Sequence, residues 1–283
     1  MESVALWNTA VSLELGARYM RPNRLRDLLD EGRPSIATHA LISWPGIVEL
    51  IGQTGQYDYV EFVAEYAPYD LYALENFGRA VDLFDNFSAM MKIEQEPRTY
   101  LSVRAIGSGI QNLLFADVRT PEDARDCVQA VRAESPATGG LHGVGMRRDV
   151  GYVLECGSPA FIEALERAVV MLMIEKDEAV RRLDEVLGVG GVDMVQFGPG
   201  DYSMSIGKAG TSSDPTVLEA ESYVIKTALS MGIQPRAEMD SPDAAKRYLD
   251  MGVRHFCMNA DVSILSNWWA VNGEALHAVL DGA

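Results

Sequence analysis

The sequence predicts an α/β fold, a (β/α)8 TIM barrel with an N-terminal helical extension and a C-terminal helix. Short apolar runs alternate with helix-periodic stretches in about eight units from residue 35 onward, which is typical of this barrel. The 283 residues, 48% of them apolar, are enough for one barrel-sized domain. A doubly wound open sheet is the alternative, but the G-x-G-x-x-G pattern that it would need for a dinucleotide is missing after the first strand.

The order of elements follows from the apolar runs and the residues that interrupt them. Residues 1–33 are expected to form the helical extension, with a helix at 23–30, and residues 34–283 the barrel domain. Proline after Trp44 and the pair Thr120 and Pro121 mark two helix starts, because proline suits the first turn and threonine caps it. Strands are expected at 35–42, 57–63, 89–93, 112–116, 169–174, 194–197, 234–239 and 255–259. Helices are expected from 45 and at 76–87, 99–106, 124–132, 177–187, 214–231, 241–251 and 265–280.

Charge and cysteine content exclude several classes of function. Lys and Arg total 24 against 41 Asp and Glu, so the net charge is 24 − 41 = −17, which disfavours nucleic acid or an anionic membrane as a partner. The three cysteines are far apart and show no C-x-x-C spacing, so neither a disulfide framework nor a zinc knot is expected. We find no secretory leader and no apolar run long enough to span a bilayer, and we expect a cytoplasmic protein.

The most informative stretch contains two apolar runs that each end at a carboxylate. The run 169–174 stops at Glu175, and after a helix-periodic stretch and a glycine-rich turn the run 194–197 is followed by Asp201. In a right-handed strand–helix–strand unit both carboxylates emerge at the same end of neighbouring parallel strands. Such a pair suits a hard divalent ion that keeps positions open for substrate oxygens. The alternative is that Glu175 favours a helix dipole and that Asp201 caps a turn.

This stretch resembles the HpcH/HpaI aldolases, metal-dependent pyruvate aldolases with citrate lyase beta-type relatives. The resemblance rests on the metal-binding Glu at a strand end and on a later G-P-x-D-L-S-x-S-x-G motif, which here spans residues 198–207 with Tyr202 in place of Leu. It implies a TIM barrel, a divalent ion (Mg²⁺ or Mn²⁺) on Glu175 and Asp201, and substrate contacts at Pro199 and Gly200. The implied activity is that of a class II aldolase, a lyase acting on a 2-oxo acid through a metal-stabilised pyruvate-type enolate.

Two departures from the family pattern fall on residues that the resemblance implies are catalytic. The family's D-x-E-H-x-P segment keeps Glu65 and Pro68 here, but Tyr66 stands in place of the His and Val63 in place of the first acid. A phenol with a pKa near ~10 is a poor base at neutral pH unless a metal or cation lowers that pKa. Tyr66 and Glu65 are therefore candidates for catalysis, with the alternative that Tyr66 shapes the pocket.

The family's substrate-binding Arg is also missing from its strand, since Ile93 occupies the matching place. Lys92, Gln95 or Arg98 can substitute, and we favour Lys92 because it lies within the strand. The alternative for Lys92 and Arg98 is solvated surface charge. His39, on the first expected strand, either faces the pocket as a substrate contact or is a packed structural residue.

Three interpretations of function stay open. The first is the metal-dependent aldolase; the second is a family member with shifted chemistry, namely a hydrolase or decarboxylase of an oxo acid or a citrate lyase beta-like CoA-ester lyase. The third is a protein that binds metal and oxo acid without turnover. No basic cluster for CoA phosphates is evident. Trp268 and Trp269 in the expected C-terminal helix favour a homo-oligomer, as does the family's habit of exchanging that helix.

The glycine-rich segment 139–148 resembles an R-G-V-G segment of the family.

Overall fold

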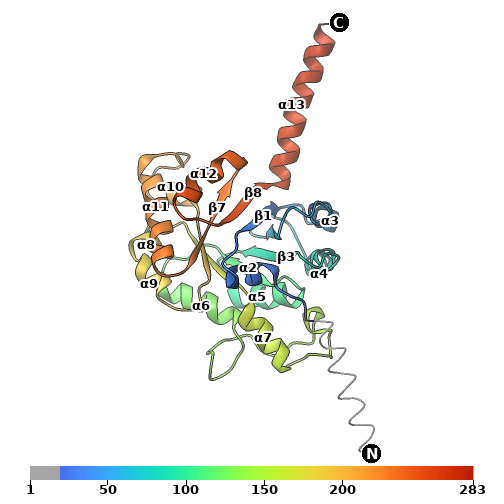
Figure 1. The fold of residues 1–283 in the computed structure, drawn as a ribbon, viewed down its shortest axis with the longest axis vertical. Coiled ribbons are helices and arrows are strands. Elements are labelled where there is room, and N and C mark those ends of the chain that lie inside the picture. Colours follow the sequence, from blue (N-terminus) through green and yellow to red (C-terminus); the bar gives the residue numbers. More distant parts are fainter. Residues whose placement is uncertain (1–19, 283) are drawn as a thin grey trace, which may run out of the picture.

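The architecture is a closed barrel of eight parallel strands, seen in a computed structural model that describes residues 20–282 (Figure 1). Neighbouring strands pair in sequence order and β8 returns to pair with β1, so the predicted TIM barrel is confirmed and the open sheet is excluded. The strands are β1 Ser35–Ala40, β2 Tyr59–Val63, β3 Ser88–Ile93, β4 Asn112–Phe115, β5 Val170–Ile174, β6 Met194–Phe197, β7 Gln234–Met239 and β8 His255–Ala260. All eight lie within or next to the ranges expected from the apolar runs.

The helices surround this barrel, and several begin at capping residues. Thr120 caps its helix through the Asp123 amide, and the Asp123 carboxylate accepts from the Thr120 amide in return, a complete capping box. The helices are α2 Arg24–Asp30, α3 Pro45–Gln53, α4 Leu71–Val81, α5 Arg98–Gly107, α6 Pro121–Val131, α7 Pro159–Arg167, α8 Asp177–Arg181, α9 Leu183–Leu187, α10 Pro199–Ser205, α11 Pro215–Ser230, α12 Ala245–Asp250 and α13 Asp261–Asp281, with short 3-10 helices η1 Arg148–Val150 and η2 Pro242–Ala244.

Several helices differ from the expectation for local reasons. Helix α4 starts earlier than predicted because Asp70 caps it through the Ala73 amide. The helix expected at 177–187 is divided into α8 and α9 at Arg182, whose backbone leaves the helical region. Helix α7 is not among the expected helices, although Ser158 caps it and Pro159 opens it in the usual way. Of the expected N-terminal extension, residues 1–19 lie outside the described residues.

Helix α2 closes the amino end of the barrel. Leu25 of α2 is fully buried and packs with the inward-facing apolar side chains of the strands, among them Tyr59, Met90 and Met171. Asn23, which caps α2, exchanges amide hydrogen bonds with the buried Asn112 of β4 (2.7 and 3.1 Å). The amino end of the interior is therefore closed by apolar packing and by this pair of Asn side chains, and the carboxyl ends of the strands stay accessible.

Helix α13 projects away from the barrel (Figure 1). Asp261, its first residue, is buried and its carboxylate accepts hydrogen bonds from the Leu41 and Ile42 amides, which anchors the helix to the end of β1. Trp268 and Trp269 are 61% and 63% exposed in this single chain. Self-association through α13 stays a prediction. No helix in residues 20–282 combines the length and apolar content needed to cross a membrane.

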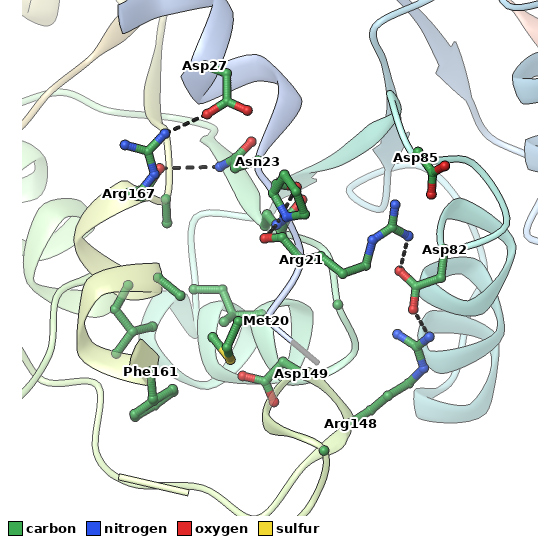
Figure 2. Close-up of a pocket in the computed structure, with 18 of the residues that line it drawn as sticks. Met20, Arg21, Asn23, Asp27, Asp82, Asp85, Arg148, Asp149, Phe161 and Arg167 are labelled. Carbon is green, nitrogen blue, oxygen red and sulfur yellow. Dashed lines mark hydrogen bonds and ion pairs between the residues drawn. The ribbon is translucent and has the colours of Figure 1, made fainter. Parts of the chain in front are cut away.

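A cavity of about 770 Å³ lies at the amino end of the barrel (Figure 2). Its wall includes Met20, Asp149 and Phe161, and Asp82 pairs there with both Arg21 and Arg148. Arg148 ends the glycine-rich segment 139–148, so the end of that segment lies at the opposite end of the barrel from Glu175. Barrel enzymes carry their chemistry at the carboxyl ends of the strands, so the active site is expected there and not in this cavity.

Candidate active site

Glu175 and Asp201 come to the same end of the barrel, as the strand–helix–strand pattern predicts. Glu175 directly follows β5, and Asp201 lies in the first turn of α10 directly after β6. Strands β5 and β6 are paired neighbours, with Ile174 opposite Phe197. Lys176, the residue after Glu175, forms an ion pair with Asp201, so the two carboxylates lie in the same region of the barrel mouth.

The carboxylate of Glu175 is held in place before any ligand binds. It is 2% exposed, and its Oε1 accepts a hydrogen bond from the Asp117 amide at 2.8 Å. Gly198 gives the other oxygen its space, because a Cβ at that position would lie 2.7 Å from Glu175 Oε2. Burial raises the pKa of Glu175 above its ordinary value, although the charge of Lys92 opposes the shift.

Lys176 connects the ends of three strands through ion pairs, a role that no sequence pattern indicates. Its Nζ lies 2.6 Å from Asp117 Oδ1 and 2.7 Å from Asp201 Oδ1. Burial lowers the pKa of Lys176, but the hydrogen bonds to Asp117 and Asp201 outweigh it and raise the pKa above the ordinary value. The side chain is therefore an ammonium placed between two carboxylates.

Lys92 and Glu65 form a buried ion pair beside Tyr66. Lys92 Nζ lies 2.6 Å from Glu65 Oε2 and 3.4 Å from the Tyr66 hydroxyl. Burial lowers the pKa of Lys92, but the charges of Glu175 and Glu65 more than compensate and raise it well above the ordinary value. Lys92 thus keeps its positive charge inside the barrel mouth, which is what recognition of an anionic substrate requires.

Tyr66 stands at the rim of this site, 60% exposed. Burial around its hydroxyl raises the pKa of Tyr66 above 10.0, and the nearby Lys92 reverses this only in part. The phenol is therefore protonated at neutral pH and can donate a hydrogen bond. A catalytic base at this position would require the opposite shift of the pKa.

A second polar cluster lies deeper in the barrel and includes His39. His39 Nε2 lies 3.4 Å from Glu61 Oε1 and 3.3 Å from Glu238 Oε1. Glu61 is fully buried and forms an ion pair with the buried Arg236 of β7, which also donates to the Tyr59 hydroxyl at 3.1 Å. Burial raises the pKa of Glu61, but Arg236 dominates and the pKa is lowered. A single Glu within an otherwise apolar strand was the available signal for this cluster.

The other proposed substrate contacts differ in their relation to this site. Pro199 and Gly200 open α10 directly before Asp201, and the space beside Gly200 is open, because a Cβ on this residue would meet no heavy atom within 4 Å. Arg98 is not brought to the site. It is buried at the start of α5, with its Nη1 3.1 Å from Asp123 Oδ1 of α6.

Comparison with known proteins identifies the family of the chain and relatives of the same fold. The sequence profile described as HpcH/HpaI aldolase/citrate lyase matches residues 86–256, more than half of the chain. The chain belongs to this family. A hydroxypyruvate/pyruvate aldolase of Delftia acidovorans is 29% identical over 249 residues, covering 86% of this chain and 88% of the relative. A 4-hydroxy-2-oxo-heptane-1,7-dioate aldolase of Shigella boydii is 28% identical over 244 residues, covering 86% of this chain and 91% of the relative.

Solved structures of the HpcH/HpaI family share the whole architecture. A family protein from Burkholderia cenocepacia superposes with a TM-score of 0.81 at 25% identity, covering 91% of this chain and 99% of that structure. An HpcH/HpaI aldolase from Desulfitobacterium hafniense has a TM-score of 0.79 at 24% identity, over 89% of this chain and 96% of that structure, a likeness of fold.

The residues at the strand ends fit the divalent ion that HpcH/HpaI family membership implies. Within residues 20–282 no group of three or more His, Cys, Asp and Glu side chains forms a complete ion cage. Mg²⁺ is commonly held by only one or two carboxylates together with water and substrate oxygens, so two carboxylates such as Glu175 and Asp201 are enough in number. The preset Glu175 carboxylate and the space left by Gly198 agree with this use.

Proposed function

We propose that this protein is a divalent-metal-dependent aldolase that makes or breaks a carbon–carbon bond next to the keto group of a 2-oxo acid. The observation that carries the proposal is the arrangement at the carboxyl ends of the strands. There Glu175 and Asp201 follow neighbouring strands, and the positive charge of Lys92 inside the barrel acts to lower the pKa of Glu175. The aldolase relatives support the same reaction class.

Glu175 and Asp201 would hold the metal. A divalent ion at that place supplies Lewis acidity, which polarises a keto group and stabilises the charge of a pyruvate-type enolate.

Lys92 binds the negative charge of the substrate in this proposal. Its ammonium is permanently charged, nearly buried and held by Glu65 in one orientation, so little freedom is lost when it donates to a carboxylate. Glu65 acts on Lys92, which makes it a positioning residue. Tyr66, protonated at the rim, donates a hydrogen bond to a substrate oxygen.

His39, Pro199 and Gly200 have lesser parts. Pro199 and Gly200 shape the wall beside Asp201, where the open space next to Gly200 can admit substrate. His39 belongs to the deeper cluster with Glu61 and Glu238 and supports the floor of the site.

A second candidate function is a protein that binds metal and an oxo acid without turnover. Tyr66 favours it, because a phenol with a raised pKa occupies the place that the resemblance assigns to a His acting in proton transfer.

The test is pyruvate release from 4-hydroxy-2-oxo acids with Mg²⁺ or Mn²⁺, followed by coupling to lactate dehydrogenase. We expect turnover in the wild type and none in Glu175→Gln or Asp201→Asn. Glu219→Gln, on the exposed side of α11, is the matched control and should be fully active. Turnover that survives both site variants would reject the metal assignment. Tight oxalate binding without turnover on any oxo acid would favour the second function.

A further inference from the structure

Lys176 occupies a place where its charge conflicts with that of a bound metal. The ammonium joins Asp201 Oδ1 at 2.7 Å, and Asp201 is one of the two residues that would hold the ion. The side chain is 10% exposed, so water screens its charge poorly. An ammonium and a divalent ion on the same carboxylate repel each other strongly in such surroundings.

Lys176 has a second anionic partner, Asp117, which can pair with the ammonium when the contact with Asp201 breaks. Asp117 Oδ1 lies 2.6 Å from the Lys176 ammonium, and the backbone amide of Asp117 donates to Glu175. Asp117 follows β4 with a φ of +55°, and the hydrogen bond of its amide to Glu175 holds it beside the site. Because Asp117 already contacts the ammonium, Lys176 keeps an anionic partner when its contact with Asp201 is broken.

We propose that Lys176 competes with the divalent ion for Asp201 and so sets the affinity of the site for metal. In the ion-free protein the ammonium neutralises Asp201. When the ion binds, the ammonium withdraws to Asp117, and the metal site gains a free carboxylate. This inference rests on the proposed metal site at Glu175 and Asp201 and adds a residue that controls it.

Calorimetric titration with Mn²⁺ or Mg²⁺ alone, without substrate, tests the competition. Lys176→Met removes the charge and keeps the length of the side chain, and we expect it to bind the ion about tenfold more tightly or better, because one charge-assisted hydrogen bond no longer has to be broken. Lys176→Arg keeps the charge and should bind as weakly as the wild type. Lys226→Met, exposed on α11, makes the same change in net charge away from the site and should leave the affinity unchanged.

Asp117→Asn tests whether the Lys176 ammonium moves to Asp117 when the ion binds. In the wild-type background it takes away the second partner of Lys176, so the ammonium stays on Asp201 and ion affinity falls. In the Lys176→Met background the same substitution should have a clearly smaller effect, because no ammonium remains to be relocated. Equal effects in both backgrounds would mean that Asp117 acts only through its own charge, which contradicts the withdrawal.

The outcomes separate this inference from the metal assignment. Equal ion affinity in wild type and Lys176→Met, with binding lost in Glu175→Gln, overturns the competition and keeps the metal site. Binding that persists in Glu175→Gln and Asp201→Asn overturns both. An ion that binds Lys176→Met but not the wild type supports the competition in its strongest form. Thermal melting confirms that each variant is folded before it is titrated.

Discussion

Replacement of Lys92 by methionine tests the charge recognition at the centre of the proposed mechanism. The substitution keeps an unbranched side chain of similar length in β3 and removes the only cation that Glu65 contacts in the described part of the chain. A hydrogen bond to a charged group is worth about 1.5 to 3 kcal/mol, and each ~1.4 kcal/mol is a factor of ten. We therefore expect kcat/KM for pyruvate release to fall roughly 10- to 150-fold.

The same substitution has a cost in stability that must be separated from its effect on catalysis. Glu65 loses its partner while its side chain is 18% exposed. Breaking a buried ion pair by removing one partner costs about 3 to 5 kcal/mol, and the partial exposure of Glu65 places this pair at or below the lower figure. Urea denaturation should show that loss in Lys92→Met, and the double variant with Glu65→Gln should recover part of it.

The assay compares kinetic and stability data for Lys92→Met, Lys92→Arg and the double variant. Lys92→Arg retains the charge and should keep most of the activity. Recovery of stability in the double variant without recovery of kcat/KM would support the role of Lys92 in binding the substrate anion. An unchanged kcat/KM in Lys92→Met would refute the reasoning, because the buried charge would then have no part in recognition.

Three further predictions concern the rim tyrosine, the buried histidines and the C-terminal helix. Tyr66→Phe should lower kcat/KM by less than about tenfold, the value of one neutral hydrogen bond, and leave metal affinity unchanged; a loss of roughly 10²-fold or more would reinstate a catalytic tyrosine. Burial lowers the pKa of His142 and of His255 to about 4 in the folded protein, below the unfolded value of about 6.5. Each neutral histidine therefore contributes about 3 kcal/mol to the free energy of unfolding above pH 6.5, and this contribution is lost as the pH falls toward 4. Denaturation of His255→Gln at several pH values should show a shallower acid dependence than that of the wild type. Sedimentation should show a homo-oligomer that dissociates when Trp268 and Trp269 are both changed to Ser; a monomeric wild type at micromolar concentration would exclude self-association.

The strands and the convergence of Glu175 and Asp201 at one end of the barrel could be predicted because they depend on local patterns. The apolar run that forms β5 is buried along its whole length, and its end determines where Glu175 emerges. The order of a parallel barrel then places Asp201 beside it, with no knowledge of side-chain contacts. Both inferences used neighbouring units of the chain, where a sequence pattern is most informative.

The contacts that the sequence did not predict join residues from separate elements. Lys176 directly follows Glu175 and resembles an ordinary charged residue before a helix, and its role depends on three strand ends coming together in space. Arg98 is the opposite case, a residue that the sequence suggested for the site and that the fold places elsewhere. It is close to Lys92 in sequence, but the first turn of α5 carries it to Asp123. The ion pair of Glu61 with Arg236 joins β2 to β7 across the barrel interior, and no local pattern encodes that pairing.

The charges around the candidate site support one divalent ion and distinct roles for the two lysines. The site carries four negative charges, from Glu65, Asp117, Glu175 and Asp201, and three positive ones, from Lys92, Lys176 and the partly exposed Arg119 beside Asp117, so 3 − 4 = −1. An uncompensated negative charge in a largely buried site is unfavourable and would repel an oxo acid, whereas one divalent ion changes the net charge to +1, which attracts the substrate anion. The Lys176 ammonium is paired with Asp201, which would hold this ion, so this contact must break when the ion binds. Lys92 is paired with Glu65, away from Asp201, and its charge remains available for the substrate anion after the ion has bound.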